Sequence, residues 1–483
     1  MSAFGSSVEK RRVLIVGGGL AGLAAARELR SHFVVTVVDA KEYFEFTPGI
    51  MRAYAKPDHW DKLTFMYHEA LDRRLGVRFI WGEVLEIDGM QRCVRVKTIF
   101  AEMEDVVPYD FCLIAGGCSF NQQSPSGESL WFPTVHERSR AGTECPHLDE
   151  RFLEGRRRRI LEEHLLLREL NDSQAQVLIV GAGFMGIEWA CELRHFFPGL
   201  QITLTDFLPN CLGPLFPAEA IQYCEDYLQR QGIKTFYERK YDPNNPEFFA
   251  NIGLRQRPDK VYIFAGVKQS NYFLPPNALS ETGPGGGGWI RINRHLQVIT
   301  KQRQEWGEGR VFAVGDCIVG CVGERPNYEI PPMPKTGYPA EQQAVHACRN
   351  IKALDRALYG IGGSPFRVSS SSSSSSPPPR PQQLSPSPSA LPSLMATWYP
   401  WGAGIFAISL GPEDGCVVVG AQSVEDSGCL WTKGKVASAQ KELIEHTKIA
   451  QCSGNGVLSR FLWYVVHHWP INICGKGPLC SLF

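Results

Sequence analysis

The sequence predicts an α/β fold that contains two Rossmann-like units and a small C-terminal β/α region. Three observations support this prediction. A glycine-rich turn near the N-terminus follows an aliphatic run and precedes an Ala- and Leu-rich segment, and the same pattern returns in mid-chain. A later aliphatic run ends in Gly-Asp. With 483 residues, of which 43% are apolar, the chain is long enough for two or three domains with substantial cores.

The first glycine-rich turn lies between a predicted strand and a predicted helix. Residues Val13–Val16 form the aliphatic run that a strand buried on both faces requires. Gly17 permits a tight turn, Gly19 lets backbone N–H groups approach a pyrophosphate, and Gly22 lets the helix pack on the strand. The next aliphatic run ends in Asp39, whose carboxylate can accept hydrogen bonds from a ribose. This context favours dinucleotide binding over an ordinary αβ turn.

The second copy has glycines at Gly181, Gly183 and Gly186. Its following strand ends in Asp206, about 20 residues after Gly186, which is the spacing of a ribose-binding carboxylate. One accidental match to this pattern is plausible, but two complete matches in one chain are not. Because Asp206 would repel a 2′-phosphate, the second site should prefer NADH, and NADPH is the less favoured nucleotide.

Charge and cysteine content exclude several classes of function. Lys plus Arg number 50 and Asp plus Glu number 50, so no global field favours nucleic acid. The run Arg156–Arg159 is predicted to be a solvated helix face rather than a phosphate-binding patch. The 15 cysteines are scattered without CxxC pairs, which predicts no metal site and a reducing, intracellular setting.

Together these motifs resemble the pyridine nucleotide–disulfide oxidoreductase superfamily, flavoproteins with two dinucleotide-binding domains. The motifs that carry the resemblance are Gly17–Gly22, Asp39, Tyr109–Ser119, Gly181–Gly186, Asp206 and Val311–Cys317. The resemblance implies that the first unit binds FAD and that the second, inserted within the first, binds NADH.

Two further turns match this family at the flavin. The chain leaves the first unit at Ala115 and Gly116, where the family usually has Thr in place of Gly116. It returns to the flavin at Gly315 and Asp316, where the family's aspartate bonds the ribityl chain.

The resemblance implies six segments, with the flavin domain interrupted by the nucleotide domain. The expected boundaries are 1–120 (first part of the FAD domain), 121–172 (connecting segment), 173–282 (NAD(H) domain), 283–360 (return to the FAD domain), 361–394 (disordered Ser/Pro-rich insertion) and 395–483 (C-terminal β-hairpin and amphipathic, membrane-facing tail).

Within the superfamily, the presence or absence of a CxxxxC cysteine pair helps to identify the acceptor of electrons from the flavin. Disulfide reductases of this family carry CxxxxC on the helix after the first acidic residue, but residues 40–92 contain no cysteine. The stretches Phe44–Gly49 and Pro334–Gln343 resemble the type II NADH dehydrogenases and the related apoptosis-inducing-factor-like quinone reductases. This likeness implies an FAD-dependent NADH:quinone oxidoreductase that moves two electrons without pumping protons. Thr47 and Pro48 should then shape the turn against the flavin ring, although a plain β-turn uses the same residues.

Four residues are candidates for the chemistry. Glu188 follows the second glycine turn, where the family has an acid near the nicotinamide; a helix-start acid favoured by the dipole is the alternative. Lys335 could offset negative charge on a reduced flavin or quinol, or be a solvated loop lysine. Tyr338 and Gln342 could line a quinone pocket or face the core.

The C-terminal segment Gly456–Trp469 is rich in aromatic and large apolar residues. It suits an anchor at a membrane surface, or a cover for the FAD domain. We therefore expect a membrane-associated protein, on the mitochondrial inner membrane or a cytoplasmic membrane face, with no clear transit peptide and no spanning helix. A homodimer is a further expectation.

Two other functions fit the same motifs. The chain could reduce a different acceptor, such as an electron-transfer protein or dioxygen. Alternatively, it could be a redox-sensing flavoprotein that acts through a partner, with the serine-rich segment as the docking site.

Overall fold

The computed structural model describes residues 10–101, 103–120, 131, 133, 135, 148–214, 216–264, 266–319, 335–360, 395–396, 405–420 and 428–454. The Ser/Pro-rich insertion and the aromatic tail expected from the sequence lie outside these residues.

The first unit is a seven-stranded sheet in the order β16-β8-β1-β2-β5-β6-β7. Its strands are β1 (Arg12–Val16), β2 (Val34–Asp39), β5 (Arg78–Asp88), β6 (Cys93–Thr98), β7 (Asp105–Pro108), β8 (Phe111–Ile114) and β16 (Val311–Ala313). The five strands from β16 to β5 run parallel, and β6 and β7 extend the sheet as an antiparallel ribbon. Residues Val13–Val16 are buried, as the aliphatic run predicted.

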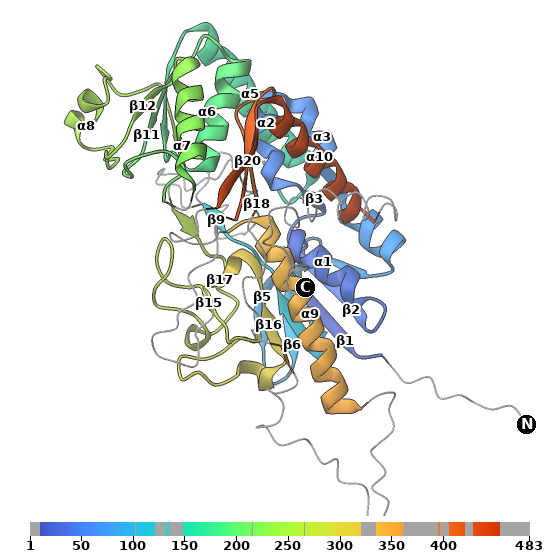
Figure 1. Ribbon diagram of the computed structural model, residues 1–483. Helices are drawn as coiled ribbons and strands as arrows, with labels where there is room; N and C mark the ends of the chain where they lie inside the picture. Colours follow the sequence, from blue (N-terminus) through green and yellow to red (C-terminus); the bar gives the residue numbers. More distant parts are fainter. Residues whose placement is uncertain are drawn as a thin grey trace, which may run out of the picture.

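Two helices cover the β1 region. Helix α1 (Leu20–Leu29) follows the glycine turn, and α9 (Gly337–Tyr359) packs along it (Figure 1). A Cβ at Gly337 would lie 2.6 Å from Leu20 Cδ1, so the two helices approach closely at their N-termini.

The second unit is a parallel four-stranded sheet in the order β12-β11-β10-β13. Its elements are β10 (Gln176–Val180), α6 (Phe184–Phe196), β11 (Gln201–Thr205), α7 (Ala218–Arg230), β12 (Lys234–Phe236), α8 (Pro246–Asn251) and β13 (Lys260–Ile263). Helix α5 (Leu153–Asp172) leads the chain into β10.

In the C-terminal region, residues 405–420 and 428–454 form a three-stranded antiparallel sheet and one helix. Strand β18 (Ile405–Ser409) pairs with β19 (Gly415–Val419), which confirms the expected hairpin, and β20 (Cys429–Lys433) extends it. Helix α10 (Lys435–Cys452) packs on this sheet. In Figure 1 these elements, coloured orange-red to red, lie beside the second unit and near helices α2 (Ile50–Ala55) and α3 (Trp60–Leu63); β18 contacts α6, and β20 contacts α7. None of the helices among the described residues has the length and apolar character needed to cross a bilayer.

The remaining strands are short and form pairs. They are β3 (Tyr43–Glu45) with β4 (Thr64–Met66), β9 (Ser119–Phe120) with β14 (Val267–Lys268), and β15 (Ile290–Arg291) with β17 (Ile318–Val319). A one-turn 3-10 helix, Thr47–Gly49, connects β3 to α2.

The prediction that Arg156–Arg159 is a solvated face is wrong for two of the four residues. Arg157 and Arg158 are exposed, with side-chain exposures of 48% and 66%. Arg156 and Arg159 are buried, because their i, i+3 spacing puts them on the face of α5 that packs inward, where carboxylates receive them.

Candidate functional site

The first glycine turn is shaped by backbone contacts. Gly17 has a φ of +98°, and a Cβ there would lie 2.4 Å from the carbonyl oxygen of Ala115. A Cβ at Gly22 would lie 1.9 Å from the Gly17 carbonyl oxygen, so only glycine lets α1 pack on the turn. Gly19 is the N-cap of α1, and a Cβ there would meet no atom within 4 Å. The turn is therefore closed on the protein side and open at the helix N-terminus, which suits a pyrophosphate.

Asp39 lies at the end of β2, beside this turn. Its Oδ2 accepts a hydrogen bond from the Gly18 N–H at 2.7 Å, and its Oδ1 accepts one from the Lys41 N–H at 2.9 Å. The buried hydroxyl of Tyr67 donates to the Gly18 carbonyl at 2.9 Å and lies 3.5 Å from Asp39 Oδ2. No sequence motif marks Tyr67, which reaches the turn from a helical segment 49 residues further along the chain.

Three strand ends meet at this turn. Strands β1, β8 and β16 are parallel neighbours, so Gly17, Ala115–Gly116 and Gly315–Asp316 lie at one edge of the sheet. Gly315 has a φ of +76°, and its N–H donates to Oε1 of the buried Gln343 at 2.7 Å. The crevice beside β1 lies where the strand order reverses, which is the usual ligand position in such sheets.

Lys335 lies against this edge rather than in solvent. Its Nζ donates to the carbonyls of Asp316 at 2.7 Å and Ile318 at 3.3 Å, and lies 3.7 Å from the Trp289 ring centroid. Burial lowers the pKa of Lys335. Burial also raises the pKa of Asp316 to about 6, and the Lys335 ammonium partly opposes that rise.

The raised pKa of Asp316 predicts a pH-dependent stability of the flavin-free protein. The folded state holds this proton more tightly than the unfolded state, so stability is lost as pH rises from about 4 to about 6. Asp316→Asn should remove a dependence on the order of 2–3 kcal/mol. Urea unfolding of the wild type and of Asp316→Asn across this pH range measures the free energy of unfolding. A difference in free energy between the two proteins that does not change with pH would contradict the prediction.

Tyr338 and Gln342 lie one turn apart at the start of α9. Gln342 Nε2 donates to the Tyr338 oxygen at 2.7 Å. Burial, and then the Glu341 carboxylate, raises the pKa of Tyr338 to about 12, so the phenol keeps its proton at neutral pH. The start of α9 packs against the Gly315–Cys317 turn, which places this pair near the same edge.

The second glycine turn repeats the geometry of the first. Gly181 has a φ of +103°, and a Cβ at Gly186 would lie 1.8 Å from the Gly181 carbonyl oxygen. Gly183 is the N-cap of α6, with no atom within 4 Å of a Cβ. Asp206 is buried, and its oxygens accept hydrogen bonds from the Ala182 N–H at 2.5 Å and the Leu208 N–H at 2.9 Å.

Glu188 is buried where α6 of the second unit, helix α2 and the C-terminal region meet. Its Oε1 accepts a hydrogen bond from the Ser409 N–H at 2.9 Å and forms an ion pair with Lys441. The C-terminal region therefore binds Glu188, and the sequence carried no signal for Lys441. The surrounding cleft is lined by Pro48, Arg52, Glu188, Glu192, Ser409, Lys441 and neighbouring residues.

The candidate residues thus fall into three groups. One lies at the edge of the first sheet, the second at the turn of the second sheet, and the third in the cleft that Pro48 and Glu188 both line. Both turns fit a dinucleotide, because each closes a glycine turn against its sheet and leaves the helix N-terminus open.

Residues 11–347 match the family described as pyridine nucleotide-disulphide oxidoreductase. The chain belongs to this family. Among curated relatives, the type II NADH:quinone oxidoreductase of Staphylococcus epidermidis (strain ATCC 12228) is 23% identical over 362 residues, covering 72% of this chain and 83% of that protein. The protein of the same name from Staphylococcus aureus (strain NCTC 8325) is 22% identical over 369 residues, with the same coverage of 72% and 83%.

Solved structures show the same fold. The sulfide:quinone oxidoreductase of Aquifex aeolicus has a TM-score of 0.62 and 16% identity, covering 94% of this chain and 95% of that chain. NDH2 from Plasmodium falciparum in complex with NADH has a TM-score of 0.59 and 13% identity, covering 95% and 97%. The predicted α/β fold is confirmed, and the chain is an FAD-dependent dehydrogenase that uses NAD(P)H.

Proposed function

We propose that this protein is an FAD-dependent NADH:quinone oxidoreductase that transfers two electrons without pumping protons. One observation carries the proposal: a chain of this family has no cysteine in residues 40–92, so electrons must leave the flavin directly for an acceptor. Its curated relatives named type II NADH:quinone oxidoreductase support a quinone as that acceptor. When bound, the flavin accepts a hydride from the nicotinamide and passes two electrons on.

The first sheet and α9 hold the flavin and the acceptor in this proposal. Gly17, Gly19 and Gly22 bind the FAD pyrophosphate, with Asp39 toward the ribose. Ala115, Gly116, Gly315 and Asp316 line the crevice toward the ribityl chain, and Thr47 and Pro48 form the turn facing the ring. The Lys335 ammonium supplies positive charge at this edge. The protonated Tyr338 phenol, held by Gln342, orients the quinone.

The second sheet binds NADH in this proposal. Gly181, Gly183 and Gly186 form the pyrophosphate cradle. Asp206 keeps a negative charge beside the ribose, which disfavours the 2′-phosphate of NADPH. Glu188 lies in the cleft that Pro48 also lines, so its carboxylate is positioned between the nicotinamide side and the C-terminal region.

We also include attachment to a membrane surface through the aromatic tail, and a homodimer, in the proposal. A lipid-soluble acceptor would reach the edge of the first sheet from such a surface. Vesicle co-sedimentation of the full chain and of a chain lacking the tail tests the attachment.

Stopped-flow spectroscopy tests the function itself. NADH should bleach the flavin rapidly and NADPH more slowly, and mixing the reduced enzyme with a short-chain quinone should restore the oxidised spectrum. Fast reduction by NADH without reoxidation by quinone would overturn the quinone assignment. Reoxidation by dioxygen or by an electron-transfer protein at a higher rate than by quinone would replace it with a different acceptor.

A further inference from the structure

Helix α5 lies between the two sheets in the sequence. Its buried charged side chains contact residues of both units. The helix has 20 residues, and three residues separate its end from the start of β10 of the second unit. Two groups of polar contacts involve its buried face: a turn cluster (Glu45, Tyr54, Glu150, Arg156) and a strand cluster (Arg159, Glu163, Lys260, Tyr262). Neither cluster belongs to the glycine cradles or to the cleft described above.

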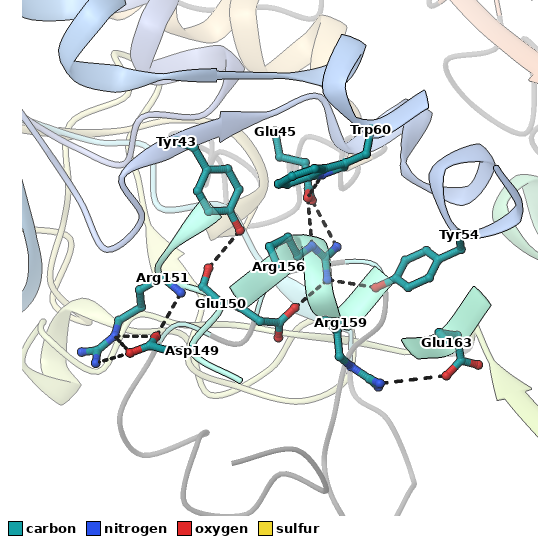
Figure 2. A network of polar contacts seen from close by, with 10 residues as sticks. All are labelled: Tyr43, Glu45, Tyr54, Trp60, Asp149, Glu150, Arg151, Arg156, Arg159 and Glu163. Carbon is teal, nitrogen blue, oxygen red and sulfur yellow. Dashed lines mark hydrogen bonds and ion pairs between the residues drawn. The ribbon is translucent and has the colours of Figure 1, made fainter. Parts of the chain in front are cut away.

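In the turn cluster, Arg156 contacts Glu45 and Tyr54, which lie before and after the Thr47–Gly49 turn in the sequence (Figure 2). Arg156 Nε and Nη2 donate to the two Glu45 carboxylate oxygens at 2.9 and 3.2 Å, just before the turn. Arg156 Nη1 donates to the Tyr54 oxygen at 3.0 Å, on the helix just after it, and to Glu150 at 2.7 Å. Arg156 has no exposed surface, so these contacts hold it in one geometry.

The strand cluster contacts β13 of the second sheet through a hydrogen bond and an ion pair. Glu163 accepts a hydrogen bond from the Tyr262 hydroxyl at 2.6 Å and forms an ion pair with Lys260 at 3.0 Å. Arg159 lies 4.0 Å from the same carboxylate, on the adjacent turn of α5 (Figure 2). Strand β13 pairs with β10, and a Cβ at Gly181 of the second cradle would lie 3.1 Å from the backbone of Phe264, which follows β13. Contacts that fix the position of β13 therefore also help to fix the position of that cradle.

Aromatic rings fill the space between the two clusters. Tyr54 makes an edge contact with Trp189 of α6 at 6.3 Å, and Trp189 makes one with Tyr262 at 5.3 Å. All three rings are buried, and so are Glu45, Arg156 and Glu163, so water screens these charges little, whereas the Lys260 side chain is 26% exposed. Buried ion pairs tolerate little displacement, because a separated charge there loses its compensation.

Resting on the proposed function, we propose that Arg156 and Glu163 are positioning residues for hydride transfer. They are seven residues apart, about 10.5 Å along a rigid helix. Arg156 fixes the turn that faces the flavin ring, and Glu163 fixes the strand beside the nicotinamide cradle. The helix thereby sets the distance between the two cofactor rings. An error of about 1 Å in that distance costs on the order of 100-fold in rate.

The test uses flavin-loaded variants reduced in the stopped-flow instrument, with rates expressed per bound flavin. Arg156→Lys keeps the charge but loses the two-oxygen contact with Glu45, and should lower the reduction rate constant about 10- to 100-fold. Tyr262→Phe removes one hydroxyl and should lower it about 3- to 10-fold. The Kd for the nucleotide and the rate of reoxidation by a short-chain quinone should both stay within about threefold, since neither substituted residue belongs to a glycine turn or to the acceptor side.

Arg157→Lys and Arg158→Lys are the matched controls, because they make the same change on the exposed side of α5. Reduction rate constants of Arg156→Lys and Tyr262→Phe equal to those of the controls would overturn the positioning role. So would equal losses in reduction and reoxidation, which indicate general damage. If Arg156→Lys binds no flavin, Tyr262→Phe decides. The assay uses whichever of NADH and NADPH reduces the wild type. If quinone does not reoxidise the flavin, only the assignment of the acceptor is wrong and the positioning role stands. A wild type that neither nucleotide reduces would overturn both proposals.

Discussion

A Gly19→Val variant should fold normally and contain no flavin. Gly19 has a φ of −66°, which any residue can adopt, and no protein atom lies within 4 Å of the added Cβ. The new side chain would fill the open N-terminus of α1, where the proposed FAD site receives the pyrophosphate. The variant should therefore show an unchanged far-ultraviolet circular dichroism spectrum and lack the flavin absorbance of the wild type.

Gly22→Val is the contrasting variant on the same helix. Its Cβ would lie 1.9 Å from the Gly17 carbonyl oxygen, a backbone atom that cannot move without displacing α1. This variant should lose both flavin and folded structure. A yellow, flavin-loaded Gly19→Val protein would refute the cradle, whereas a Gly19→Val protein that fails to fold would show that the space at Gly19 belongs to the protein core.

Lys448→Met should lower the free energy of unfolding by about 3–5 kcal/mol. Lys448 of α10 forms an ion pair with Glu341 of α9, and their residue exposures are only 2% and 9%. Removing the ammonium leaves the Glu341 carboxylate buried beside an apolar side chain. Urea unfolding of the wild type and the variant measures the loss, and a change below about 1 kcal/mol would contradict the expectation.

Two further variants isolate the pair from other effects of the substitution. Lys448→Met combined with Glu341→Gln removes both charges and should recover part of the stability, because no uncompensated charge remains. Lys435→Met makes the same change at an exposed position of α10 and should shift the free energy by less than about 0.5 kcal/mol.

The glycine turns could be predicted because their determinants are local. Gly17, Gly22, Gly181 and Gly186 are each required by a contact within a few residues or by a neighbouring parallel strand. The run of aliphatic residues before each turn gives the strand, and the acidic residue after the second strand marks its end. Such patterns need no knowledge of how distant segments meet.

Contacts between distant segments could not be predicted in the same way. Arg156 lies in a run of four arginines that composition alone assigns to solvent, yet its partner Glu45 is 111 residues away. Tyr67 reaches Gly18 across 49 residues, and Lys441 reaches Glu188 across 253. These pairings depend on the tertiary fold, which decides whether a charged side chain finds a buried partner.

The ion pair between Glu188 and Lys441 joins two residues that leave the ribosome at very different times. Both glycine cradles are complete once residues through Asp316 have been made, but Ser409 and Lys441 are synthesised later. A nascent chain can therefore begin to fold while Glu188 still lacks these partners. The cleft therefore gains the part of its lining that Ser409 and Lys441 provide only after β18 and α10 have been synthesised.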